Sequence, residues 1–292
     1  MKKVTKAVIP AAGYGTRFLP FTRSVPKEMI PLVDKPVIQY VVEEAAASGI
    51  TDILVIVSSG KEALQNHFAP VPGLEARLAA SGKAGLLEEL HRIDGLARLT
   101  FVHQHVLNGL GGALRLAREF AGGDAFAVLL GDTVVDGIGK PATAQLLDAY
   151  YATGAPVVGL ERVERSKLRQ YGVISGTSVD GKLFKLDALV EKPDPAEAPS
   201  DLAIASRYLL TPEIFDALEA TGPGKNGEIQ LTDAMRLLLG VGEMYGLAFA
   251  ARRYDIGDKL EFLKSTVTFG LRRPEYREAL LSHMRALLDE IK

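Results

Sequence analysis

A glycine-rich turn after the first apolar run is the segment of the chain best suited to chemistry. The run at residues 7–10 leads into Ala-Ala-Gly-Tyr-Gly-Thr-Arg at residues 11–17. Gly13 and Gly15 let the backbone approach a ligand, and successive amides in such a turn point at phosphate oxygens. Arg17 adds a forked cation, and the two alanines leave room for a planar base. The turn by itself fits a phosphate-binding loop and a plain structural turn equally well.

Two familiar phosphate motifs do not describe this turn. The dinucleotide fingerprint requires a third glycine where Phe18 stands, and a P-loop requires Lys-Ser/Thr after its last glycine. Ten residues beyond Arg17, Lys27 supplies a second cation. A lone lysine is usually a solvated surface group, so Lys27 gains meaning only from its context.

A carboxylate stands at the end of another apolar run. Asp132 follows Val-Leu-Leu-Gly at residues 128–131. A strand of an α/β sheet delivers such a residue to the crevice at its carboxyl end, where ligands collect. Mg²⁺ typically takes one or two carboxylates together with substrate phosphates and water. Asp132 is therefore a candidate metal ligand, although a helix cap or a turn former fits the same spacing.

The elements that must position these residues alternate along the chain. Extended, β-rich runs are expected at residues 7–10, 53–57, 99–103, 126–130 and 156–160. Helical patterns lie between them at residues 37–47, 74–90, 111–120 and 142–151. This alternation predicts an α/β protein with a parallel or mixed sheet covered on both faces.

The second half of the chain has a different pattern. From residue 171 onward, turn signals separate short extended runs, which predicts a small antiparallel insertion. Helical patterning returns at residues 212–220, 228–239, 258–271 and 274–292. Without repeats or an obvious linker, one large domain with a C-terminal helical tail is favoured over two independent domains.

Composition narrows the functional classes. The 292 residues are 47% apolar and 24% charged, which excludes disorder as the dominant state. A formal net charge of −2 provides no global field for nucleic acid or an anionic membrane. The chain has no cysteine, hence no disulfide, thiolate nucleophile or cysteine-ligated metal. No segment reaches the ~18 apolar residues of a membrane span, and Pro10 and Arg17 interrupt any signal sequence, so a cytoplasmic location is expected.

Several ordered motifs further along the chain carry a family resemblance. They are Asp34-Lys35-Pro36-Val37-Ile38, Gly109-Leu110-Gly111, Glu191-Lys192-Pro193, Arg207-Tyr208 and Gly227-Glu228-Ile229-Gln230-Leu231-Thr232. Together with the glycine-rich turn and Lys27, they resemble the sugar-phosphate nucleotidyltransferases, and most closely the bacterial UTP:glucose-1-phosphate uridylyltransferase branch. The resemblance extends from about residue 4 to about residue 270.

The resemblance implies a fold and a reaction. The fold is a Rossmann-like three-layer mixed sheet forming a nucleotidyltransferase domain at residues 4–270, with a helical tail at residues 271–292 available for contacts in a homodimer or homotetramer. In the reaction, glucose 1-phosphate attacks the α-phosphorus of UTP, giving UDP-glucose and pyrophosphate without a covalent enzyme intermediate. Positioning, charge neutralisation and Mg²⁺ then supply the catalysis.

The resemblance also implies roles for individual residues. The nucleotide would contact Ala11, Ala12, Gly13, Gly15, Thr16, Gln104 and Gly109. Arg17, Lys27 and Lys192 would neutralise charge during catalysis. The sugar phosphate would contact Asp132, Gly172, Glu191 and Lys192, and Mg²⁺ would bind Asp132 and Asp255. Simpler interpretations remain: Gln104 as a polar strand end, Asp255 as a charge at a helix N-terminus, and Glu191-Lys192 as a solvated pair.

Two positions depart from the commoner pattern of the family. Gly112 stands where histidine usually follows Gly-Leu-Gly, and Gly131 stands where proline often precedes the aspartate. These departures concern the details of base and sugar contact more than the reaction class. Another nucleotide or sugar specificity in the same family, and a non-catalytic regulatory paralogue, are the alternatives that the sequence leaves open.

Overall fold

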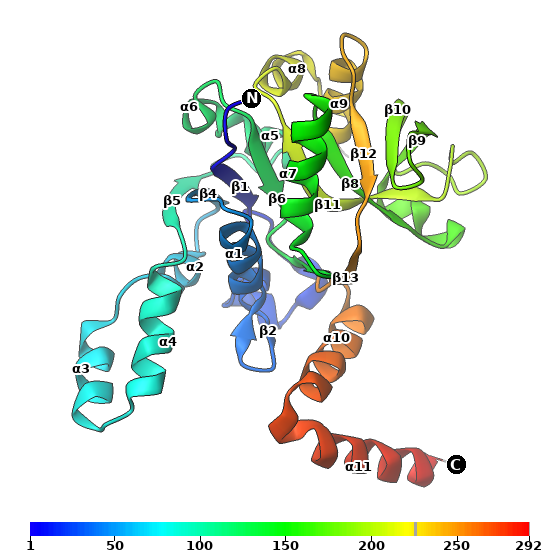
Figure 1. The fold of residues 1–292 in the computed structure, drawn as a ribbon. Helices are drawn as coiled ribbons and strands as arrows, with labels where there is room; N and C mark the ends of the chain where they lie inside the picture. The colour runs from blue at the N-terminus through cyan, green and yellow to red at the C-terminus, as the bar shows by residue number, and fades with distance from the viewer. Residues whose placement is uncertain (225–226, 292) are drawn as a thin grey trace.

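A nine-stranded mixed sheet forms the centre of the computed structural model, which describes residues 1–224 and 227–291 (Figure 1). The strands follow the order β5-β4-β1-β6-β11-β8-β12-β10-β9. They are β1 (Lys6–Pro10), β4 (Asp52–Val57), β5 (Arg98–His103), β6 (Phe126–Leu129), β8 (Val157–Arg162), β9 (Gly172–Ser178), β10 (Leu183–Glu191), β11 (Leu202–Leu210) and β12 (Tyr245–Ala248).

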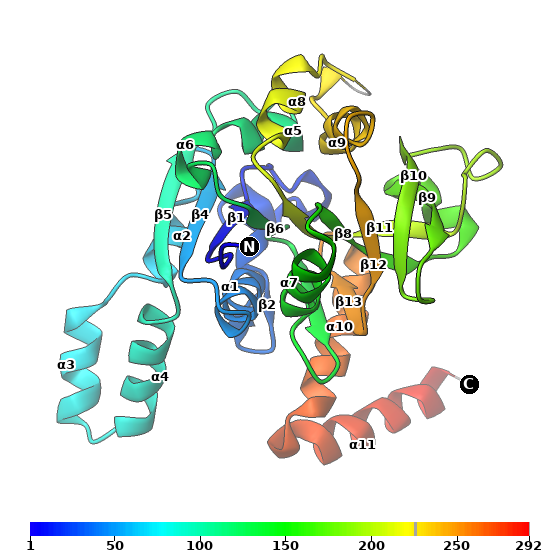
Figure 2. The ribbon, with the colours of Figure 1, turned by 45° about the horizontal axis from the view of Figure 1, so that its top comes forward.

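Helices cover both faces of this sheet, as the alternating pattern predicts. One face packs on α1 (Val37–Ala47), α2 (Glu62–His67) and α7 (Ala142–Thr153). The opposite face packs on α5 (Leu110–Arg115), α8 (Ile214–Ala220) and α9 (Leu231–Leu239). Figure 2 shows these helices on either side of the strands. The expected three-layer α/β architecture is confirmed.

The first strands of the sheet are parallel, and this places their carboxyl ends at one edge. β1 pairs in parallel with β4 on one side and β6 on the other, and β4 pairs in parallel with β5. β1, β4 and β6 are buried on both faces, which explains their nearly continuous apolar runs. The loops that follow these strands therefore gather at the same edge.

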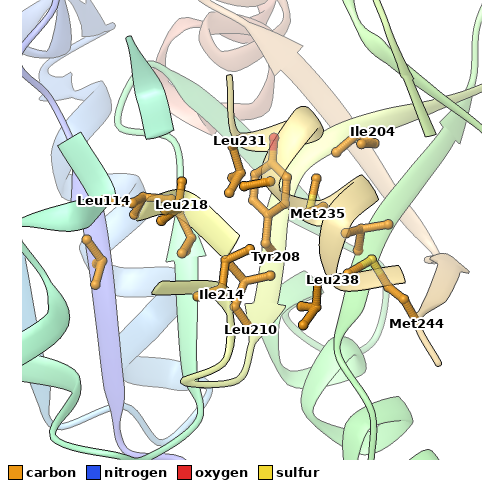
Figure 3. Packing of buried hydrophobic residues seen from close by; sticks show 14 of the residues in the cluster. Leu114, Ile204, Tyr208, Leu210, Ile214, Leu218, Leu231, Met235, Leu238 and Met244 are labelled. Carbon is orange, nitrogen blue, oxygen red and sulfur yellow. The ribbon is translucent and has the colours of Figure 1, made fainter. Parts of the chain in front are cut away.

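The central antiparallel strand, β11, is not among the extended runs expected from the sequence. All nine of its residues are buried, and it pairs antiparallel with β6 and β8. Figure 3 shows Tyr208 of β11 in the core beside Ile214 and Leu218 of α8 and Met235 and Leu238 of α9. Because polar residues interrupt its apolar sequence, the chain does not show the pattern of a buried central strand here.

The antiparallel pairing expected beyond residue 171 is confirmed, and the strands that form it lie at one edge of the main sheet. β9 and β10 are antiparallel, as expected, but β10 pairs with β12 and β9 pairs with β11. These strands therefore extend the main sheet. Two small ladders complete the structure, one between β2 (Pro31–Leu32) and β3 (Lys35–Pro36) and one between β7 (Thr133–Gly137) and β13 (Ala251–Asp255).

Two of the expected helices are divided in the structure. Residues 74–90 do not form one helix: α3 (Pro72–Ala80) and α4 (Ala84–Asp94) form a hairpin that projects from the body (Figures 1 and 2). Gly82 lies between them with φ of 69°. A glycine in this left-handed conformation commonly ends a helix, which explains the division. Residues 111–120 likewise divide into α5 and α6 (Arg118–Ala121).

The C-terminal helices, α10 (Lys259–Arg272) and α11 (Pro274–Ile291), lie beyond the sheet. Phe262 and Phe269 of α10 join a small core with Ile30, Leu32 and other residues near β2 and β13. α11 buries no residue, and the last residue of the expected tail, Lys292, lies outside the described part. No helix within residues 1–224 and 227–291 is long and apolar enough to cross a membrane.

Candidate active site

Two adjoining cavities lie beyond the carboxyl ends of the parallel strands. The first, of about 460 Å³, follows β1 and β5, and the second, of about 410 Å³, reaches β9, β10 and β13. Lys27, Asp132 and Glu228 line both. Such a crevice at the ends of strands is the usual ligand site of an α/β sheet.

Every residue that the sequence places in the site lines one of these cavities. The first cavity contains Ala11, Ala12, Gly13, Gly15, Thr16, Gln104 and Gly109. The second contains Arg17, Gly172, Glu191, Lys192 and Asp255. The structure therefore brings together residues that lie more than two hundred positions apart in the chain. They form two neighbouring groups, one in each cavity.

The glycine-rich turn is held open against Lys27. Gly15 has φ of 66°, and a side chain there would begin 3.0 Å from Cβ of Lys27. The hydroxyl of Thr22 donates a hydrogen bond to the Gly15 carbonyl at 2.8 Å. Only glycine combines this left-handed conformation with so close a contact. The backbone of the turn therefore lines the first cavity next to Lys27.

The two cavities meet at an ion pair. Nζ of Lys27 donates a hydrogen bond to Oδ2 of Asp132 at 2.6 Å. Burial alone would lower the pKa of Lys27, but the carboxylates of Asp132 and Glu28 raise it above the ordinary value. Burial would raise the pKa of Asp132, and Lys27 keeps it below the ordinary value. Both groups are therefore charged at neutral pH, with a cation placed where two anionic ligands would meet.

A second ion pair, which the sequence does not reveal, lies directly beneath the first. Nζ of Lys61 donates to both oxygens of Glu28, at 3.0 and 2.8 Å, and also to the Ala11 carbonyl. Glu28 is fully buried and Lys61 nearly so. Burial raises the pKa of Glu28 and lowers that of Lys61. This pair ties the Ala11 loop to the segment that carries Lys27, because Glu28 is the next residue.

The far end of the first cavity has the character of a base pocket. Gln104 follows β5 and is buried, and Leu107, Leu110 and Ala113 line the same space. Nε2 of Gln104 donates to Oδ1 of Asn108 at 3.1 Å and contacts the Gly109 carbonyl at 3.4 Å. Apolar side chains together with one amide group fit a nucleobase.

The second cavity places cations and hydroxyl-binding groups together. Lys192 lies 3.1 Å from Glu191 and has φ of 48°, a strained conformation for a residue with a side chain. A side chain at Gly172 would begin 2.9 Å from the Thr232 hydroxyl and 3.3 Å from Glu191. This wall therefore has no room for a side chain at Gly172, and the acidic and basic groups beside it fit a phosphorylated polyol.

The two aspartates expected to bind metal approach a common point at Gly257. A β-carbon added there would lie 3.1 Å from Oδ1 of Asp255 and 3.4 Å from Oδ2 of Asp132. Asp255 is oriented by Arg253 at 3.2 Å and by the Tyr171 hydroxyl at 3.5 Å. Oδ1 of Asp255 accepts the Gly257 N–H at 3.1 Å, and a guanidinium nitrogen of Arg17 lies 3.7 Å from the same point. Both carboxylates therefore lie near one point, and carboxylate oxygens suit a hard divalent cation that also binds phosphate.

Within residues 1–224 and 227–291, no group of three or more His, Cys, Asp or Glu side chains converges. Asp132 and Asp255 are two carboxylates near Gly257, and Mg²⁺ usually takes one or two carboxylates together with substrate phosphates and water.

Comparison with known proteins relates this chain to one family. The family model described as Nucleotidyl transferase matches residues 6–268. The UTP–glucose-1-phosphate uridylyltransferase of a Staphylococcus epidermidis strain is 45% identical over 98% of this chain and 99% of its own length. The Bacillus subtilis (strain 168) protein of the same name is 43% identical over 99% of both.

Solved structures agree with the sequence relatives. A UDP-glucose pyrophosphorylase complexed with UDP-glucose superimposes with a TM-score of 0.85 at 34% identity, covering 93% of this chain and all of the other. A UTP-bound enzyme from Acinetobacter baumannii gives a TM-score of 0.88 at 35% identity, covering 99% of this chain and all of the other. On this fold, these motifs and these relatives, the chain belongs to the nucleotidyl transferase family, in the group of the UTP–glucose-1-phosphate uridylyltransferases.

Proposed function

We propose that this protein transfers the uridylyl group of UTP to glucose 1-phosphate, forming UDP-glucose and pyrophosphate. The observation that carries the proposal is the pair of adjoining cavities that meet at Lys27 and Asp132. One has the walls of a nucleotide pocket and the other those of a sugar-phosphate pocket, so an oxygen of one ligand can face the α-phosphorus of the other. The names of the relatives support this choice of substrates.

The residues around the junction of the two cavities have different roles in a direct displacement at the α-phosphorus of UTP. We assign the triphosphate to the backbone of the turn at Gly13, Gly15 and Thr16, and the charge of the departing pyrophosphate to Arg17 and Lys27. Arg17 is exposed and Lys27 is held at the junction of the cavities. No protein nucleophile is needed, because positioned cations stabilise the charge that develops in the transition state.

The remaining residues hold the acceptor and the base. Glu191 accepts hydrogen bonds from sugar hydroxyls, Lys192 binds the phosphate of glucose 1-phosphate, and Gly172 allows the ring to approach the sheet. Gln104 and Gly109 contact uracil through amide and backbone groups. These roles are supported by the division of the same residues between the two cavities.

We assign the metal site to Asp132 and Asp255, and the metal to Mg²⁺. The two carboxylate oxygens that face the space beside Gly257 support this assignment. When bound, Mg²⁺ neutralises phosphate charge and fixes the orientation of the triphosphate. Arg253 and Tyr171 hold Asp255 in place for that purpose.

Pyrophosphate release tests the whole proposal. Purified protein is incubated with glucose 1-phosphate, Mg²⁺ and each of UTP, CTP, ATP, GTP and dTTP in turn, and formation of the nucleotide sugar is confirmed by chromatography. We expect turnover with UTP that is abolished by a chelator and restored by Mg²⁺. Greater turnover with another nucleotide or sugar phosphate would replace the substrate assignment. UDP-glucose binding without turnover in any mixture would instead identify a regulatory paralogue.

We also propose a division of the chain and an assembly. Residues 4–270 form the catalytic domain, and residues 271–292 form a tail that contacts a second copy of the chain in a homodimer or homotetramer. The absence of any buried residue in α11 and the apolar side chains it exposes support this assignment. The cytoplasmic location stays a prediction from the sequence.

A further inference from the structure

The side chain of Asn108 occupies the space that a side chain at position 112 would need. A β-carbon added to Gly112 would lie 1.8 Å from Oδ1 and 2.5 Å from Cγ of Asn108. Its three nearest neighbours are all atoms of that carboxamide. Gly112 therefore permits the side chain of Asn108, in the loop before α5, to pack against the helix and reach the Gln104 amide.

Asn108 in this position and the Gly109 carbonyl together determine which way the Gln104 amide faces. Nε2 of Gln104 donates to Oδ1 of Asn108 at 3.1 Å and lies 3.4 Å from the Gly109 carbonyl. A backbone carbonyl can only accept a hydrogen bond, so the Gln104 atom that faces it must be the NH₂ group. Once Nε2 is directed to these two acceptors, Oε1 is the end of the amide left for a ligand.

An outward Oε1 distinguishes between pyrimidine bases. In the part of the chain that the structure describes, no group donates to Oε1 of Gln104. The N3 position of uracil carries a hydrogen that this oxygen can accept, whereas N3 of cytosine is itself an acceptor and would repel it. Reversing the amide would reverse this preference, because an NH₂ group donates to cytosine N3.

We propose that Asn108, admitted by Gly112, is a positioning residue that fixes the Gln104 amide so that the nucleotide pocket selects uracil over cytosine. The inference rests on the proposed function, since it assigns the nucleotide to the first cavity. It adds a residue pair, Asn108 and Gly112, that acts through Gln104 and does not itself contact the reacting atoms.

The test compares UTP with CTP as substrate of the purified enzyme and its variants. In N108A the nearer of the two acceptors for Nε2 is lost, and only the Gly109 carbonyl at 3.4 Å opposes turning of the amide. We therefore expect the ratio of kcat/KM for UTP to that for CTP to fall by roughly tenfold, the effect of about one hydrogen bond. N108D keeps an acceptor at the same place and should retain most of the ratio. N66A removes an exposed asparagine of α2 and should not change it.

The pair Asn108 and Gly112 makes a stricter prediction through a double-mutant comparison. G112A should lower the UTP:CTP ratio as N108A does, because its methyl group displaces the Asn108 carboxamide. In the N108A background the same G112A change should have almost no further effect, since the atoms that it would strike are gone. Independent, multiplying effects of the two changes would overturn the proposal, as would an unchanged ratio in N108A.

A binding measurement separates failure of this inference from failure of the proposed function. Calorimetric titration with UDP and with CDP reports base discrimination whether or not turnover occurs. A wild-type protein that lacks turnover but prefers UDP would contradict the proposed reaction and leave the Asn108 inference supported if N108A loses that preference. The KM for glucose 1-phosphate should stay the same in every variant, whereas a general disturbance of the site would raise it.

Discussion

Lys27 is the residue on which the charge balance of the site depends. It is the only lysine that lines both cavities within the described residues, and its ammonium group meets Asp132 at 2.6 Å. The shifted pKa values of the pair keep both groups charged from mildly acidic to alkaline solution. A fixed cation of this kind costs no reorganisation when pyrophosphate begins to leave.

Lys27→Ala should therefore slow the reaction while leaving the fold intact. Losing one preorganised electrostatic contact commonly raises the activation barrier by roughly 3 kcal/mol, which lowers kcat about a hundredfold. Steady-state kinetics with UTP and glucose 1-phosphate measure the change in kcat, and circular dichroism confirms that the variant is folded. Lys182→Ala, on an exposed turn, is the matched control. A kcat near that of the wild type would remove Lys27 from the mechanism.

Residues whose sequence context carries a motif could be placed in the site from sequence. Lys27 and the Gly13–Gly15 turn stand in such a context, and they do line the cavities. Lys61 and Arg253 could not be predicted, because a single lysine or arginine in a sequence looks the same whether it is buried or solvated. Their partners lie 33 and 92 positions away, and only the folded chain brings them together.

At the scale of elements, β11 is held to its neighbours by a buried ion pair. Arg207 is fully buried and donates to both oxygens of Glu44 on α1, at 2.6 to 3.1 Å, and to the Thr133 carbonyl at 3.0 Å. Thr143 of α7 donates to the same carboxylate through its N–H and its hydroxyl. The central strand, α1, α7 and the start of β7 are thus joined through the Arg207–Glu44 ion pair, next to Asp132 in the chain.

Arg207→Met should destabilise the fold, because it leaves the Glu44 carboxylate buried without its cation. Breaking one partner of a buried pair typically costs about 3 to 5 kcal/mol of unfolding free energy, measured by chemical denaturation followed by circular dichroism. The double variant R207M/E44Q should recover part of that loss, since it removes the unpaired charge as well. Arg118→Met breaks an exposed ion pair with Asp216 and should cost less than about 1 kcal/mol. Equal losses in R207M and R118M would contradict this account.

At the scale of the whole molecule, the parallel strands and the antiparallel pairing beyond residue 171 could be predicted, and the central strand β11 could not. Strands such as β4 and β6 are short apolar runs between turn signals, and the helices between them repeat at helical spacing. β11 carries Ser206 and Arg207 within its run, and Ser206 has φ of 61° at an irregularity in the pairing with β8. A polar pair at a bulge interrupts the apolar pattern, so the strand is not visible in the sequence.

The net charge of −2 is a property of the whole molecule that bears on how anionic substrates are attracted. Two polyanionic substrates must be collected by a protein without a positive overall field. In the described part of the chain, the structure places four cations around the second cavity, but four carboxylates line the same cavity, so the protein charges there balance: Arg17, Lys27, Lys192 and Arg253 against Asp132, Glu191, Glu228 and Asp255. Attraction of the phosphates should therefore depend on where single cations such as Lys27 are placed, and not on the net charge of the cavity or of the whole molecule.

The exposed C-terminal helix leads to the prediction for the assembly. Leu287, Leu288 and Ile291 of α11 are 41%, 60% and 81% exposed, and Leu280 reaches back toward Gly270 of α10. An apolar stripe of this kind on a long helix is rarely left in water. We therefore expect the full chain to be oligomeric and a chain ending at residue 273 to have the mass of a monomer, measured by light scattering during size-exclusion chromatography.

A full-length variant distinguishes the apolar stripe from the mere length of the tail. Leu287→Ser combined with Leu288→Ser should dissociate the oligomer, because two serines remove much of the apolar surface on one side of α11. Glu278→Ser combined with Arg285→Ser, on exposed positions away from that stripe, should leave the mass unchanged. A monomeric wild type, or dissociation only in the second variant, would show that α11 does not hold the copies together through its apolar side.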